Sequence, residues 1–152
     1  MIYSSEDAVN HSHPAAALPH QHLIVRAEVE SAPSDPDYIK VWLTNIIRGI
    51  GMKLAVGPEA NPIAYYCEIP GNQGLTGVAI LETSHCAIHV WDSASPRLVQ
   101  FDLYTCSEIT VPTVLKFLDE FRPRRIEYKF IDREFTLREV DSSGIIQSPG
   151  DH

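Results

Sequence analysis

The feature that most constrains this fold is a set of three apolar segments placed close together within residues 75–105. Residues 75–82, 86–91 and 98–105 are rich in branched and aromatic side chains, which favour β-strands. The last two are separated by turn-forming residues, namely Asp92, Ser93, Ser95 and Pro96. Short links of this kind join strands that run in opposite directions. The segment therefore predicts an antiparallel meander.

Alternation within the second of these strands divides its side chains between two faces of the sheet. Successive residues of a strand point to opposite sides. The prediction is that one face carries Cys86, Ile88 and Val90 and the other carries Ala87, His89 and Trp91. Two further strands are expected, one over residues 23–30 and a last one over residues 126–132.

Two amphipathic helices complete the pattern. Pro36 suits the first position of a helix that Ser34 or Asp35 can cap. Apolar residues then recur at helical spacing: Ile39, Trp42, Leu43, Ile46, Ile47 and Ile50. A second helix is expected to begin at Pro112 and to be stopped by Pro123. This order predicts an α+β two-layer sandwich in which two helices pack on one face of an antiparallel sheet.

The length of 152 residues suits one domain. We expect a flexible His-rich N-terminal arm over residues 1–22, a single domain over 23–140 and a flexible tail over 141–152. Four of the seven histidines lie in the arm, but no scaffold fixes them, so no metal site is expected.

Charge and cysteine content exclude several classes of partner. The formal net charge is −8, with no basic run, so nucleic acid is not expected. No apolar run is long enough to span a bilayer, so no membrane partner is expected either. The three cysteines lack the spacing of a zinc site or a disulfide framework, and a cytoplasmic location is expected.

Several chemically reactive residues lie within the meander. Thr83, Ser84 and His85 lie at a strand junction, His89 lies in the next strand, and Cys106 ends the third. A nucleophile, a base and a thiol in adjacent segments are able to converge, although a sheet with incidental polar residues is the commoner explanation of such spacing. A hydrolase built on Cys106 and His89 is a remote alternative, because no orienting acid is identifiable.

Four ordered motifs in this block resemble the prokaryotic-type S-adenosylmethionine decarboxylases, which are small pyruvoyl-dependent enzymes of polyamine and spermidine synthesis. The motifs are Gly74-Leu75-Thr76-Gly77, Thr83-Ser84-His85, Ile88-His89-Val90-Trp91 and Tyr104-Thr105-Cys106. The resemblance covers roughly residues 22 to 132. It implies the two-layer α+β fold and a homodimer with sites near the interface.

The resemblance also implies that the chain makes its own cofactor. The Ser84 hydroxyl attacks the carbonyl of Thr83, and the resulting ester is eliminated to leave a pyruvoyl group on a chain of residues 84–152. His89 matches the base for the α-proton of Ser84, and Thr76 matches a hydroxyl that hydrogen-bonds the oxyanion.

In the mature enzyme the resemblance assigns further residues to the reaction. Cys106 matches an acid that reprotonates the α-carbon, and Trp91 and Asp92 match the substrate-binding region. The implied small-molecule substrate is S-adenosylmethionine. Cys67 and Cys86 are interpreted as core residues, and His85 as a structural or supporting residue.

Two departures from the family pattern keep alternatives open. Thr83 stands where the family has Glu, and Asp92-Ser93 stands where it has Pro-Glu. The second change favours a related decarboxylase of a basic amino acid, arginine or ornithine. The first favours an unprocessed, non-catalytic paralogue with a binding role.

Overall fold

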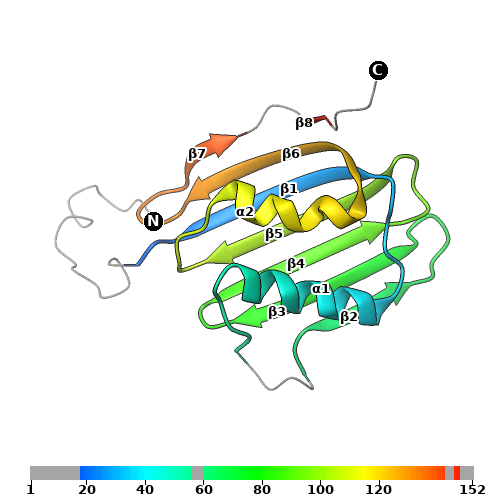
Figure 1. Cartoon of the computed structure of the whole chain (residues 1–152), viewed down its shortest axis with the longest axis horizontal. Helices are drawn as coiled ribbons and strands as arrows, with labels where there is room; N and C mark the ends of the chain where they lie inside the picture. Colours follow the sequence, from blue (N-terminus) through cyan, green and yellow to red (C-terminus); the bar gives the residue numbers. More distant parts are fainter. Residues whose placement is uncertain (1–17, 56–59, 143–145, 148–152) are drawn as a thin grey trace, which may run out of the picture.

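A computed structural model describes residues 18–55, 60–142 and 146–147 of the chain. Its strands form one eight-stranded antiparallel sheet in the order β2-β3-β4-β5-β1-β6-β7, with β8 paired to β6 (Figure 1). The strands are β1 (Gln21–Val29), β2 (Ile63–Cys67), β3 (Gly74–Leu81), β4 (Ser84–Trp91), β5 (Arg97–Thr105), β6 (Pro123–Asp132), β7 (Arg138–Ser142) and β8 (Ile146–Gln147). The helices are α1 (Pro36–Gly49) and α2 (Val111–Leu115), the latter continued by a 3-10 helix, η2 (Lys116–Phe121).

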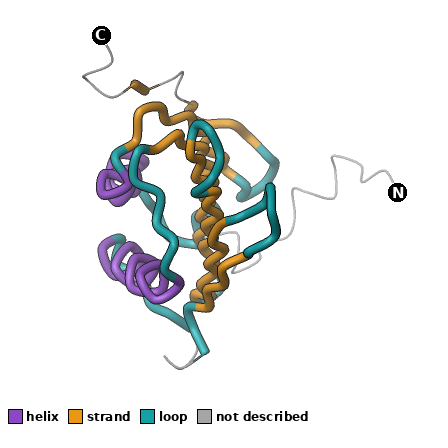
Figure 2. The backbone as a smooth tube through the Cα atoms, turned by 90° about the vertical axis from the view of Figure 1, so that its right-hand side faces the viewer, coloured by secondary structure: helices purple, strands orange, loops and turns teal. Residues whose placement is uncertain are grey.

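The helices lie together on one side of the sheet, which confirms the predicted two-layer α+β sandwich (Figure 2). The core between the layers is built from one side of every central strand and one side of each helix. On the opposite, open face of the sheet, several large apolar side chains are exposed: Ile24, Ile63, Tyr65, Val78 and Ile80. The sheet therefore has one face fully packed and one face available for contact.

Helix α1 forms as its sequence predicts. Asp35 accepts a hydrogen bond from the backbone N–H of Asp37 at 2.9 Å, and Pro36 occupies the first turn. The predicted apolar stripe is buried over Ile39, Trp42, Leu43, Ile46 and Ile47. Full burial of a side chain of this size stabilises the fold by about 1.5–3 kcal/mol.

The second helix differs from its prediction. The predicted second helix is α-helical only over α2, and its remainder is the tighter 3-10 helix η2. Arg122 ends η2 in a left-handed conformation, with φ 53°. The indole of Trp42 donates to the carbonyl of Phe117 at 2.9 Å and ties η2 to α1. Leu118 and Phe121 still reach the core.

The meander is confirmed as β3-β4-β5, joined in the predicted antiparallel order. The predicted division of β4 is also confirmed, because Cys86, Ile88 and Val90 are buried while Ala87, His89 and Trp91 are only half-buried. The strand β1 inserts between β5 and β6, which local sequence patterns do not predict.

Both chain ends depart from the predicted boundaries. β1 begins at Gln21, so residues 21 and 22 belong to the sheet and not to the arm, because they pair with β5 and β6. Residues 141–142 end β7 and residues 146–147 form β8, although the sequence analysis assigned them to a tail. Residues 18–20 of the expected arm are also described, and the His20 carbonyl accepts a hydrogen bond from the backbone N–H of Arg133. Residues 1–17 of the arm, and residues 143–145 and 148–152 of the tail, lie outside the described residues. Within the described ranges, no helix is long and apolar enough to cross a membrane.

Candidate active site

The predicted nucleophile and thiol meet at the turn between β3 and β4. The Cys106 backbone N–H donates to Ser84 Oγ at 3.1 Å, and Ser84 Oγ donates to Cys106 Sγ at 3.6 Å. Thr83 Oγ1 lies 3.0 Å from the same sulfur. Ser84 is buried with 8% of its surface exposed, while Cys106 is half-buried. We call Thr83, Ser84 and Cys106 the serine-end cluster.

Thr83 has an unfavourable backbone conformation. Its φ is 51°, in the left-handed region that β-branched residues rarely adopt. The turn that joins Leu81 to Ser84 contains only Glu82 and Thr83, and the pairing of Leu81 with Ser84 holds it closed. The strained residue directly precedes the Thr83–Ser84 bond, which is the predicted cleavage site.

The electrostatics of the serine-end cluster favour a thiolate. The hydrogen bond from Thr83, and then that from Ser84, lower the pKa of the Cys106 thiol. Partial burial opposes this shift, and the net direction is downward. In this form of the chain, Cys106 is therefore ionised at a lower pH than an ordinary cysteine.

Thr76 and His89 form a second, separate pair, which we call the histidine-end pair. They face each other across β3 and β4, with Thr76 Oγ1 3.0 Å from His89 Nδ1. Both residues line a cavity of about 240 Å³ together with Trp91 and Asn72. The Trp91 indole donates to Asn72 Oδ1 at 2.9 Å, and its ring centroid lies 6.2 Å from that of His89.

The serine-end cluster and the histidine-end pair do not converge within one chain. Ser84 and His89 are five residues apart along β4, a separation of about 17 Å at the usual rise of a strand. The expectation that nucleophile, base and thiol gather from adjacent segments is therefore met for Ser84 and Cys106 but not for His89. The reason is that an extended strand separates residues that are close in sequence, so Ser84 and His89 lie at opposite ends of β4.

The predicted substrate-binding residues Trp91 and Asp92 lie near the histidine end. The Asp92 carboxylate accepts from the Tyr66 hydroxyl at 2.9 and 3.2 Å. This contact, together with burial, raises the pKa of Tyr66.

Cys86 is fully buried, as predicted, but the interpretation of Cys67 as a core residue is wrong. Cys67 ends the edge strand β2 and lines the cavity beside Thr76, because an edge strand has a neighbour on one side only.

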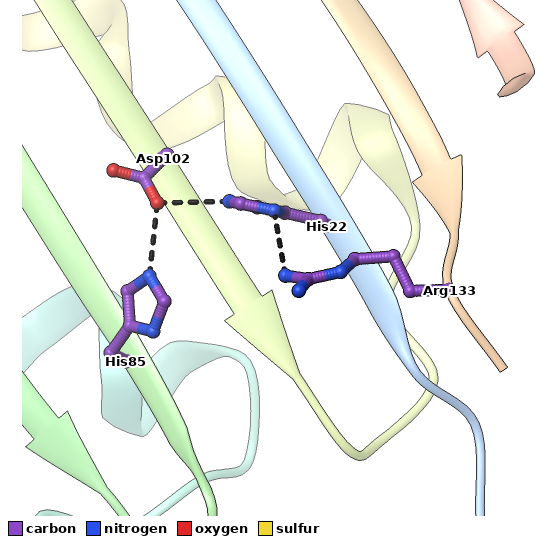
Figure 3. A network of polar contacts seen from close by, with 4 residues as sticks. All are labelled: His22, His85, Asp102 and Arg133. Carbon is purple, nitrogen blue, oxygen red and sulfur yellow. Dashed lines mark hydrogen bonds and ion pairs between the residues drawn. The ribbon is translucent and has the colours of Figure 1, made fainter. Parts of the chain in front are cut away.

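A third group of polar side chains was not predicted. His22, His85 and Asp102 meet on the open face of the sheet, with both imidazoles within 3.1 Å of Asp102 Oδ2 (Figure 3). One signal was present in the sequence: Asp102 is a carboxylate between two buried apolar residues of β5, Phe101 and Leu103, and lies on the half-buried face. The contribution of β1 could not be anticipated without the strand order.

Comparison with known proteins places the chain in a family that fits this fold and these contacts. The family model described as S-adenosylmethionine decarboxylase matches residues 22–134. The match covers the whole region from β1 to the end of β6 and therefore most of the chain. The chain belongs to the S-adenosylmethionine decarboxylase family.

Individual relatives agree on the family and differ in the substrate they name. An S-adenosylmethionine decarboxylase proenzyme of Methanococcus maripaludis is 39% identical over 66 residues, which are 40% of this chain and 50% of that protein. One of Parasynechococcus marenigrum is 36% identical over 83 residues, which are 51% of this chain and 62% of that protein. An arginine decarboxylase proenzyme of Aeropyrum pernix is 37% identical over 91 residues, which are 57% of this chain and 67% of that protein. The chain thus spans about half the length of several curated relatives.

Proposed function

We propose that this chain is a self-processing, pyruvoyl-dependent decarboxylase in which the Thr83–Ser84 bond is cleaved. The observation that carries the proposal is the serine-end cluster, where the Ser84 hydroxyl lies against the Cys106 thiol beside a left-handed Thr83. Thr83 and Ser84 suit the formation of a pyruvoyl group at residue 84, because relief of strain at Thr83 favours opening of the peptide bond that follows it.

The cleavage proceeds in balanced steps. Ser84 Oγ bonds to the carbonyl carbon of Thr83 as the Thr83–Ser84 C–N bond breaks, and the serine nitrogen takes the hydroxyl proton. A base then removes the α-proton of Ser84, and the Cβ–Oγ bond breaks to release the carboxylate of Thr83. Water converts the remaining unsaturated residue to a pyruvoyl group and releases ammonia. The products are residues 1–83 and a pyruvoyl-bearing chain of residues 84–152.

The distance between the two ends of β4 supports a homodimer. His89 is the proposed base and Thr76 the proposed oxyanion donor, yet both lie about 17 Å along the strand from the Ser84 of their own chain. A twofold axis that lies between two open faces, perpendicular to their strands, places the histidine end of one copy over the serine end of the other. The apolar side chains exposed on this face suit such a contact.

After cleavage, the residues of the cluster take part in decarboxylation. The pyruvoyl group supplies a carbonyl that accepts the electron pair left when carbon dioxide departs. Cys106 holds the proton that the α-carbon of the product needs. Loss of the Ser84 hydroxyl and departure of Thr83 remove the two groups that stabilise the thiolate, so cleavage favours the protonated thiol that this role requires.

The proposed substrate is S-adenosylmethionine, bound beside Trp91 and Asp92 near the histidine end. A basic amino acid such as arginine is the second candidate, supported by the relative named for arginine and by the absence of Pro-Glu after Trp91. The negative net charge suits either cationic substrate.

Intact-mass measurement tests the function directly. We expect two chains that divide between Thr83 and Ser84, with a carbonyl that phenylhydrazine traps on the second. Ser84→Ala is expected to remain whole, and Cys106→Ala is expected to be cleaved yet to release carbon dioxide about 100-fold more slowly or worse. A purified chain that stays whole and traps no hydrazine contradicts the proposal and supports an unprocessed paralogue. Release of labelled carbon dioxide from S-adenosylmethionine, arginine or ornithine then identifies the substrate.

A further inference from the structure

Two histidines share one carboxylate oxygen on the open face of the sheet. His22 Nε2 in β1 donates to Asp102 Oδ2 at 2.9 Å, and His85 Nε2 in β4 donates to the same atom at 3.1 Å (Figure 3). Asp102 lies in β5, between those two strands. Burial raises the pKa of the Asp102 carboxyl, but the two histidine hydrogen bonds outweigh it and the net direction is downward. Asp102 is therefore held as an anion.

The surroundings of this group fix the orientation of both rings. Arg133 Nη1 lies 3.2 Å from His22 Nδ1, and a guanidinium can only donate, so Nδ1 accepts and the proton of neutral His22 lies on Nε2. The ring of His85 stacks on that of Tyr104, with centroids 5.8 Å apart. The guanidinium of Arg133 covers the same tyrosine ring at 4.7 Å.

The same three ligand atoms lie within 4.8 Å of one another, as they do in sites for divalent metals. Arg133 argues against that use. A histidine that binds a metal through Nε2 normally donates its Nδ1 proton to an acceptor, whereas here Nδ1 faces a cation that must itself donate. The arrangement suits a network held by protons.

The network of His22, His85 and Asp102 lies next to the proposed cleavage site, which indicates a role in the cleaved protein. His85 directly follows Ser84, so its backbone nitrogen carries the group formed at residue 84. Tyr104, which stacks on His85, lies two residues before Cys106. Cleavage leaves His22 in the chain of residues 1–83, whereas His85 and Asp102 lie in the chain of residues 84–152. The network therefore spans the two products.

We propose that Asp102 and His22 are positioning residues that hold His85, and with it the group at residue 84, in place against Cys106. This inference rests on the proposed function. Before cleavage, residue 84 is held by the chain on both sides. Once the bond is broken, it is a free end anchored through His85 alone, so the hydrogen bonds to the His85 ring matter most in the cleaved protein.

The test compares cleavage with turnover in Asp102 variants of the full chain. In Asp102→Ala we expect complete cleavage, a KM within about threefold of the unaltered value and a kcat lowered about tenfold or more, because small misplacements of reacting groups are costly. Asp102→Asn keeps an acceptor oxygen and is expected to recover most of that loss. His22→Ala removes one of the two donors and is expected to cause a smaller loss. The matched control is Asp35→Asn, which removes an exposed carboxylate at the start of α1, in the helix layer and away from the network, and keeps an oxygen that accepts the cap hydrogen bond.

Nitrogen NMR of the histidine rings gives a readout that is independent of activity. In the unaltered protein we expect His22 to keep its proton on Nε2, and Asp102→Ala to abolish this fixed form in His22 and His85 while the backbone spectrum is retained. If Asp102→Ala does not fold, the same comparison is made with His22→Ala and Asp102→Asn. Micromolar binding of Zn²⁺ that requires His22 overturns the proposal, as does unchanged turnover in Asp102→Ala or a loss of cleavage parallel to the loss of turnover. Failure of the unaltered chain to cleave contradicts the proposed function instead, and the NMR result then stands alone.

Discussion

The two ends of β4 are built in opposite ways. The serine end is a tight turn in which Thr83 is left-handed and the hydroxyls of Thr83 and Ser84 both contact the sulfur of Cys106. The histidine end is a regular ladder in which Thr76 and His89 face each other beside a small cavity. The serine end has an unfavourable backbone conformation, whereas the histidine end has ordinary strand geometry. Each end lacks the chemistry of the other, and the rigid strand between them keeps the two ends apart.

Mixing two inactive variants tests this separation most strongly. Ser84→Ala and His89→Ala are each expected to remain whole when expressed alone. When they are co-expressed in equal amounts, about half of the His89→Ala chains are expected to be cleaved, because random pairing puts half of them beside a copy with an intact His89. Mass spectrometry of the mixture gives the cleaved fraction. Absence of cleavage in the mixture, while the unaltered chain cleaves, means that both ends act within one copy.

The histidine end also depends on the close approach of β3 and β4 at Gly74. A Cβ at this position would overlap the carbonyl of Val90, which is backbone and cannot move aside. Gly74→Ala is expected to lower the free energy of unfolding by about 2–3 kcal/mol and to slow cleavage, because it displaces Thr76 from His89. Urea denaturation measures the first effect and the time course of cleavage the second.

Gly71→Ala is the matched control for this change. Gly71 has a φ of 83°, but no atom lies within 4 Å of an added Cβ, so only the backbone cost remains. Equal losses of stability in the two variants would mean that the approach of β3 to Val90 is not tight.

The sequence predicted the local structure around both ends, but not their separation. Alternation in β4 placed Cys86 and His89 on the correct faces because a strand has a fixed period of two. The distance from Ser84 to His89 follows from the same strand, and it is the reason why we propose a second copy at the site. The approach of His22 to Asp102 requires β1 to insert beside β5, a long-range pairing that no local pattern encodes. The hydrogen bond from Trp42 to the Phe117 carbonyl in η2 is likewise a long-range contact.

The pH dependence of Cys106 alkylation tests the serine end before and after cleavage. Thr83 and Ser84 lower the pKa of the Cys106 thiol in the whole chain, so its thiolate is present at lower pH than after these hydroxyls are removed. We expect iodoacetamide to reach half its maximal rate on Cys106 at a lower pH in whole His89→Ala than in the cleaved, unaltered protein. Peptide mapping separates Cys106 from the half-buried Cys67 and the buried Cys86. Identical midpoints for Cys106 would show that cleavage does not change its environment.

The smallest expected effect concerns the strain at Thr83. In the uncleaved Ser84→Ala background, Thr83→Gly removes a left-handed threonine, which costs about 1–2 kcal/mol, but adds the greater chain entropy of glycine in the unfolded state, about 0.5–1 kcal/mol. The net expectation is a gain of about 0.5 kcal/mol in the free energy of unfolding, measured by urea denaturation. Thr83→Ala also removes the hydroxyl near Cys106 but keeps a side chain at φ 51°, so it is expected to give no gain. If alanine stabilises the chain as much as glycine does, the hydroxyl contact and not the backbone is the unfavourable feature of this turn, and the serine end stores no strain for cleavage to release.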